Sequence, residues 1–264
     1  MYFKVLLMKY IFILIIVFNY SCQSFHDRQV PLSTERLDTI KTVPTGITAQ
    51  PLLFETAFIN GTTQIRNDST VHLYGINIGN IKISSGLVTI CDPILIDEYG
   101  IPFTQVFPTG EFPVQLSIAR QGLEEYIAFA RIKFSDEPVS KWEFALQKDQ
   151  EALPVDGKDI HGFVADGGHG IFVDHEAAKV LDRKNLLSLN DSIYREMDKH
   201  NHHFWRYNIH EFNGHNLAMF TTGFGDGLYA TYIGFDSSGK PCRLLTDMNI
   251  FNWKKKQDPL NNSQ

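Results

Sequence analysis

Short apolar runs with a period of two residues are the feature that most restricts the fold of this chain. In 76–83, isoleucines alternate with asparagine, glycine and lysine. Such alternation places one face of a β-strand in a core and the other in solvent. Further runs of β-branched and aromatic residues lie at 86–91, 112–118 and 126–134, separated by glycine, asparagine, aspartate and proline. This half of the chain is therefore predicted to be rich in β-sheet.

The second half of the chain repeats the strand pattern. Apolar runs at 162–166 and 171–173 flank the glycine-rich turn 167–170, which predicts a hairpin. The stretch 216–248 contains three apolar runs separated by turn residues, which predicts two successive hairpins. The segment 142–146 fits either a strand or a short helix, and the polar stretch that follows it is predicted to be a loop.

Two helix starts can be found between these strands. Asp174 is a suitable N-cap for a helix that runs to about Leu181. Ser188 and Asp191, three residues apart, suggest a second capping box before a helix at 193–199. The sequence therefore predicts an α+β fold, mostly antiparallel β and sandwich-like, with two short helices.

The N-terminus has the pattern of an export signal. Residues 1–21 contain two lysines and no acid, and an unbroken apolar run extends from Tyr10 to Phe18. The run is too short to cross a membrane, which takes about 20 apolar residues, but it matches the apolar core of a signal peptide. Translation could start at Met1 or at Met8, since both leave this pattern intact.

The end of this signal resembles the lipobox of bacterial lipoproteins, because Ser21 directly precedes Cys22. That resemblance implies lipidation of Cys22, with palmitate-type acyl chains, and display in the cell envelope outside the cytoplasm; the alternative is an ordinary cleaved signal beside an unrelated cysteine. Several acyl chains make such an anchor stable. We expect four parts: a signal peptide at 1–21, a flexible tether at 22–50, one β-rich globular domain at 51–253 and a disordered tail at 254–264.

Charge and cysteine content narrow the function classes. The chain has 30 acidic and 24 basic residues, a net charge of −6, and no basic stripe. Nucleic-acid binding is therefore not expected, because that interaction depends on a basic surface. Apart from Cys22, only Cys91 and Cys242 are present. They could form one disulfide in an oxidising compartment, but we favour two buried thiols, since both lie in apolar strand patterns.

Three aspartates beside glycine-rich or capping positions are the best functional candidates: Asp166, Asp174 and Asp226. Carboxylates at such turns can ligate hard cations or bind a sugar-like substrate. The same residues are also ordinary turn and capping residues, and we favour that structural interpretation. His169, in the same turn as Asp166, is a candidate acid or base, as are its neighbours His161 and His175.

Other catalytic and cofactor patterns are missing from the sequence. The five histidines between 200 and 215 lack the spacing of a zinc site, so no metal or other cofactor is predicted. The chain has no Gly-x-Ser-x-Gly elbow and no phosphate-binding loop. Cys91 is a poor candidate for a nucleophile, because its strand pattern predicts burial.

A family resemblance extends over 86–251. The motifs Cys91-Asp92-Pro93 and Pro108–Val114 are followed by Ala128–Ile132 and Trp142–Ala145, and then by the two glycine-aspartate motifs Asp166–Asp174 and Gly223–Tyr229. Their order resembles the bacterial family called domain of unknown function 4241, which implies no particular chemistry. The sequence thus favours an envelope lipoprotein that acts as a binding or interaction module. The alternative is a hydrolase that uses Asp166, Asp174 and Asp226 around a metal or a sugar-like substrate.

Overall fold

The alternating segments form a large antiparallel sheet in the computed structural model, which describes residues 47–181 and 192–254. The predicted signal peptide, most of the tether and most of the tail lie outside these residues. In spatial order, the eight strands of the sheet are β1 (Thr62–Arg66), β2 (Ser69–Ile83), β4 (Gly110–Gln121), β5 (Glu124–Lys133), β12 (Pro241–Asp247), β11 (Gly227–Phe235) and β6 (Lys141–Phe144), with β7 (Gly162–Ala165) also paired to β11.

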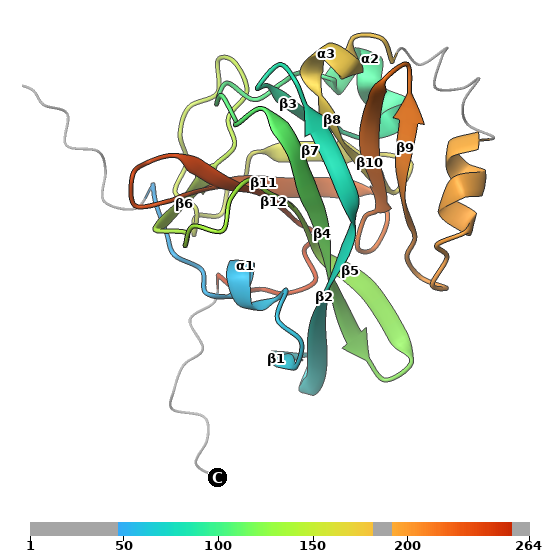
Figure 1. Cartoon of the computed structure of the whole chain (residues 1–264). Coiled ribbons are helices and arrows are strands. Elements are labelled where there is room, and N and C mark those ends of the chain that lie inside the picture. Colours follow the sequence, from blue (N-terminus) through green and yellow to red (C-terminus); the bar gives the residue numbers. More distant parts are fainter. Residues whose placement is uncertain (1–46, 182–191, 255–264) are drawn as a thin grey trace, which may run out of the picture. The chain divides into compact units, whose positions relative to one another are not determined.

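A second antiparallel sheet of four strands completes the β-structure of the described chain. Its spatial order is β3 (Val88–Cys91), β8 (His169–Asp174), β10 (His215–Thr221) and β9 (Tyr207–Phe212). β2 packs against β8, β9 and β10, and Figure 1 shows the larger sheet curling beside the smaller one. The predicted mostly antiparallel, sandwich-like α+β fold is therefore confirmed. The predicted hairpins β7–β8 and β10–β11 are wrong, because β7 pairs with β11 in the larger sheet and β8 pairs with β10 in the smaller one. The last predicted hairpin, β11–β12, is present.

The long strand β2 contains an irregularity that lets the sheets approach each other. The pairing of β2 with β4 shifts between Asn77 and Gly79, where the isoleucine alternation is also interrupted. Gly79 has a φ of +130°, and a Cβ atom at this position would lie 2.8 Å from the Ile209 side chain on β9. A larger residue would therefore be strained in its backbone and would collide with the second sheet.

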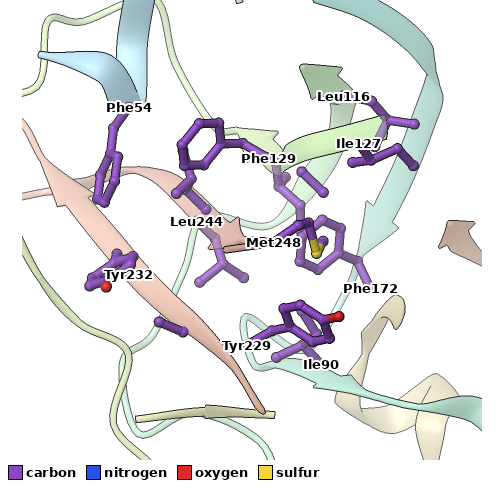
Figure 2. Packing of buried hydrophobic residues seen from close by; sticks show 14 of the residues in the cluster. Phe54, Ile90, Leu116, Ile127, Phe129, Phe172, Tyr229, Tyr232, Leu244 and Met248 are labelled. Carbon is purple, nitrogen blue, oxygen red and sulfur yellow. The ribbon is translucent and has the colours of Figure 1, made fainter. Parts of the chain in front are cut away.

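The main core lies inside the curled sheet and between the two sheets. Figure 2 shows large apolar side chains from α1, β3, β4, β5, β8, β11 and β12 packed together. Phe54 of α1 (Leu53–Thr56) has its ring centroid 4.9 Å from that of Tyr232 and 5.1 Å from that of Trp142. This aromatic contact anchors the short helix to β11 and β6.

The described chain contains more helical turns than the two that were predicted. In addition to α1, it contains η1 (Pro93–Leu95), α2 (Ile96–Tyr99), α3 (His175–Ala178) and a helix at 192–198. Asp174 caps α3 as predicted, but the helix ends three residues before Leu181. The segment 142–146 is mostly strand, as β6. Ser188 and Asp191, the predicted start of the second helix, lie outside the described residues.

Most sheet edges are covered by another part of the chain. Ala49 exchanges backbone hydrogen bonds with Trp142, which covers β6. The Phe103 N–H donates to Val88 O at 3.0 Å beside β3. The helix at 192–198 lies beside β9 (Figure 1), and its Glu196 carboxylate accepts a hydrogen bond of 2.8 Å from an asparagine of that strand. β1 is paired with β2 on one side, and its other side is not paired with any described strand.

The described helices are all too short or too polar to span a bilayer.

Candidate functional site

Two of the three candidate aspartates come together where β7 and β11 end. These strands pair antiparallel up to Ala165 and Gly227, so Asp166 and Asp226 occupy the next facing positions. Both residues are exposed. Their loops also touch directly, because the Thr222 N–H donates to Gly168 O at 2.9 Å. The two glycine-aspartate motifs therefore form one surface feature, which we call the paired aspartate loops (166–168 and 223–227).

A buried carboxylate that sequence reasoning did not select supports these loops. Asp92 is fully buried, and its Oδ2 accepts hydrogen bonds from the backbone N–H groups of Asp166, at 3.0 Å, and Gly167, at 2.7 Å. Its Oδ1 accepts from Ile94 N at 3.1 Å at the start of η1. Asp92 directly precedes Pro93, and an aspartate before a proline is a recognisable N-cap signal. The contact with the distant loop, by contrast, depends on tertiary structure.

Asp174 lies at the opposite end of β8 from His169 and serves the fold. Its carboxylate accepts hydrogen bonds from the backbone N–H groups of Ser84, Ser85 and Glu176, at 2.8 to 3.0 Å, and from the hydroxyls of both serines. Burial raises the pKa of Asp174, but the donors of Ser85 and Ser84 outweigh this effect, so the pKa is below its ordinary value. The residue is 1% exposed, and its carboxylate caps α3.

His169 is the most unusual titratable group near the paired aspartate loops. The residue is 8% exposed, and both ring nitrogens are buried without a hydrogen-bond partner among the described residues. Its ring contacts the Tyr194 ring edge-on, with centroids 5.3 Å apart. Burial lowers the pKa of His169, and the nearby Arg206 acts in the same direction; together they outweigh the opposing effects of the Gly167 backbone and of Asp92. A neutral imidazole is therefore favoured at this position.

The other predicted acid–base histidines are separated from His169. His161 pairs with the Glu151 carbonyl oxygen at 2.7 Å, and His175 lies 3.3 Å from the Thr89 hydroxyl at the far end of β8. Neither residue joins Asp166 in a catalytic arrangement. Within the described ranges, no three histidine, cysteine, aspartate or glutamate residues gather in a geometry that could hold a metal ion.

Two histidines of the segment that follows the helix at 192–198 stack on aromatic rings. His202 lies parallel to Trp205, with ring centroids 4.0 Å apart, and His200 stacks on Tyr207 at 4.5 Å. His210 is buried and its Nδ1 lies 2.8 Å from the Glu196 carboxylate. These contacts give the histidines a role in packing the 200–207 segment.

Both cysteines of the domain are free and buried, as expected. Burial raises the pKa of the Cys91 thiol far above its ordinary value, and the neighbouring Asp92 adds to this effect. The thiolate form that would act as a nucleophile is therefore suppressed.

Two exposed phenylalanines and a partly buried tyrosine, from three separate segments, form a continuous row, which we call the aromatic ridge (Phe204, Tyr126 and Phe224). The Tyr126 ring centroid lies 5.3 Å from that of Phe204 and 5.0 Å from that of Phe224. The Arg66 guanidinium covers the Phe224 ring at 4.9 Å from its centroid. Phe224, which is 54% exposed, belongs to the paired aspartate loops, so the ridge begins at the motif that the sequence singled out.

A groove of about 1050 Å³ lies next to the ridge. Its walls come from 49–53, from 63–67 of β1 and its turn, and from 249–254 after β12, together with Asp156 and Phe224. Three of the most exposed large apolar side chains line it: Leu52 (76%), Ile65 (59%) and Phe224. The ridge and the groove thus share Phe224 and form one continuous surface.

Comparison with known families places the chain in one of them. A family model described as "Protein of unknown function (DUF4241)" matches residues 81–246, which is more than half of the chain. The chain belongs to this family. None of the curated proteins or solved structures matches this chain.

The DUF4241 match covers only part of the surface formed by the aromatic ridge and the groove. It includes the paired aspartate loops and all three aromatic residues of the ridge. It excludes β1 and the 249–254 segment, which both line the groove. In this DUF4241 protein the groove is therefore built where the family region meets the flanking parts of the chain.

Proposed function

We propose that this DUF4241 protein is a lipoprotein of the cell envelope, anchored through Cys22, that binds a partner through the aromatic ridge and the adjacent groove. The observation that carries the binding role is the exposure of Phe224, Leu52 and Ile65 around one groove. Exposed apolar side chains are common singly, but their clustering at a concave surface is typical of an interaction site.

The chemistry of the ridge supports a protein partner. Aromatic residues and arginine dominate the free energy of protein–protein binding, because they bury a large area with little loss of side-chain freedom. Tyr126 and Phe224 supply such area, and Arg66 adds a cation above the Phe224 ring. The positions of these groups are held by β5, β1 and the loop before β11, so the surface is formed before a partner arrives.

A hydrolase is the second proposal, and the meeting of Asp166 with Asp226 is the observation that favours it. Paired carboxylates can serve as acid and base. Asp174, the third residue of that hypothesis, is occupied by five donors at the other end of β8. Only the pair at the loop junction is therefore retained in the hydrolase proposal.

Lipid anchoring is supported by the apolar run that ends at Cys22 and can be tested directly. The full chain and the Cys22→Ser variant are expressed in a bacterial host with a radiolabelled fatty acid. We expect label and membrane association in the wild type, and an unlabelled, soluble variant. Label that persists on Cys22→Ser would contradict the anchor, and an unlabelled wild type would do the same.

The binding role can be tested by photo-crosslinking in the same membranes. A photoreactive phenylalanine analogue replaces Phe224 in one sample and Tyr99, an aromatic residue of α2 that is 45% exposed, in a matched control. We expect one defined crosslinked product from position 224 and none from position 99. Equal labelling from both positions, or none from either, would contradict a binding surface at Phe224.

A further inference from the structure

The backbone of β1 offers hydrogen-bonding groups on its outer side. The β1–β2 hairpin turns at Asn67 and Asp68, which have φ of +49° and +59°, so Arg66 and Ser69 form the hydrogen-bonded pair that closes a two-residue turn. Along two antiparallel strands, hydrogen-bonded residue pairs alternate with pairs that are not hydrogen-bonded to each other. The N–H and C=O groups of Thr63 and Ile65 therefore point away from β2.

These groups have no partners within 47–181 and 192–254. The described chain provides no strand beyond β1 and no hydrogen bond from another segment to the backbone of Thr63 or Ile65. This arrangement contrasts with β6, β3 and β9, whose outer edges are met by other parts of the chain. An uncovered edge is a template for the addition of another strand.

The groove lies along this open edge and contains apolar contacts for side chains. Residues 63–67 line the groove together with the segment 249–254. Ile65 is 59% exposed and Leu52 is 76% exposed. An extended strand presents alternate side chains to one face, so an added strand could bury apolar residues against these two while its backbone pairs with β1.

The charge at one end of the edge indicates the chemistry of the added strand. The Arg66 side chain donates to the Gln121 side-chain oxygen at 3.3 Å and lies over Phe224. No carboxylate of the described residues forms an ion pair with it. An acidic side chain on the incoming strand would complement this cation in both charge and planar geometry.

We propose that the outer edge of β1 accepts an extended peptide segment of a partner protein, which adds one strand to the sheet and places an acidic side chain beside Arg66. This inference rests on the proposed binding function and specifies the form of the partner. Main-chain hydrogen bonds to Thr63 and Ile65 contribute affinity, whereas Ile65, Leu52 and Arg66 select the side chains.

Synthetic peptides test this mode of binding. Fluorescent peptides of about nine residues alternate valine with threonine and carry glutamate, glutamine or lysine near one end. Their binding to the full chain in detergent is followed by fluorescence anisotropy. We expect the glutamate peptide to bind about ten-fold more tightly than the lysine peptide, since they differ in charge beside Arg66.

Matched variants locate the site on the protein. Ile65→Pro removes an outward N–H without breaking a bond to β2 and should weaken binding about ten-fold, whereas Ile65→Val keeps the N–H and should bind like the wild type. Arg66→Glu should reverse the preference between the glutamate and lysine peptides. Thermal melts of each variant show whether it remains folded.

The peptide backbone provides a test that does not depend on variants. N-methylation of alternate peptide bonds blocks one edge of the peptide at a time, so methylation on one edge should abolish binding and methylation on the other should not. Equal effects of the two methylation patterns, no binding of any peptide below about 1 mM, or affinity unchanged by Ile65→Pro would overturn the inference. Dimerisation that Ile65→Pro prevents would also overturn it, by assigning the edge to a second copy. If crosslinking at position 224 succeeds while the peptides fail, the proposed function stands without this inference.

Discussion

The Asp92 carboxylate accepts a hydrogen bond of 2.7 Å from the backbone N–H of Gly167, 75 residues further along the chain. Because Asp92 is fully buried, this bond fixes one paired aspartate loop to the start of η1. The exposed Asp166 and the surface next to it therefore depend on a residue that no ligand can reach.

Replacing Asp92 by Asn should lower the free energy of unfolding by about 2 kcal/mol. The amide –NH₂ group of the variant would face a backbone N–H group that has a carboxylate acceptor in the wild type and would lose it. Asp166→Asn, in the same loop, changes only an exposed side chain and should cost about 0.5 kcal/mol or less. Urea denaturation of both variants gives the comparison. Equal losses would show that the loop does not depend on the Asp92 carboxylate.

Asp174→Asn should cost more than a simple helix cap, about 2 kcal/mol, because two serines as well as α3 donate to this carboxylate. The pKa of Asp174 is lower in the folded chain than its ordinary value of 3.8, so the folded state resists protonation. The stability it contributes is present above that ordinary value and is lost as pH falls through the folded pKa. Between pH 7 and pH 3, the free energy of unfolding should fall less in Asp174→Asn than in the wild type. An equal fall in both proteins would contradict this assignment.

His169 should make the fold sensitive to mild acid. Its pKa is lowered in the folded chain, so the unfolded chain binds the proton more readily, and stability falls as pH decreases through the ordinary value of 6.5. The groups that face it are Tyr194, Arg206 and Asp92. His169→Phe keeps a ring against Tyr194 and removes the titration, so its stability should change less than that of the wild type between pH 7.5 and 5.5. The exposed His72→Phe serves as the control, and an identical slope in all three proteins would refute the prediction.

Calcium should leave the melting temperature of the wild type unchanged to within about 1 °C. Ca²⁺ takes six to eight oxygen ligands, whereas Asp166 and Asp226 are two exposed carboxylates that form no group with a third carboxylate, histidine or cysteine among the described residues. Thermal melts in millimolar calcium, with Asp226→Asn as the matched variant, provide the measurement. A rise of several degrees in the wild type alone would show a metal-supported site and favour the hydrolase proposal.

Local sequence patterns were sufficient for most strands and for the Asp174 cap, because period-two alternation and capping depend on neighbouring residues. The pairing of β7 with β11 could not be predicted, since it joins segments more than 60 residues apart and follows from packing around the core. The β1–β2 hairpin was missed, although Asn67 and Asp68 are residues that favour its turn. The aromatic ridge could not be inferred, because Tyr126, Phe204 and Phe224 meet only in the folded chain.

Two buried groups explain why the candidate site was only partly predicted. Asp92 carries a local capping signal, but its bonds to the 166–167 backbone are long-range. His169 was selected for its place beside a glycine-rich turn, whereas its lack of hydrogen-bond partners among the described residues is a property of the packed fold. Sequence reasoning therefore located the loops and could not show how they are supported.

Amide hydrogen exchange on the full chain, resolved for each residue of β1, tests the central claim of an uncovered binding edge most directly. The N–H groups of Gln64 and Arg66 pair with β2, so we expect them to exchange at least about ten-fold more slowly than those of Thr63 and Ile65, which point outward. Addition of the glutamate peptide should then slow exchange at Thr63 and Ile65. Slow exchange at all four residues in the free chain would show that the edge is already covered and would contradict the account.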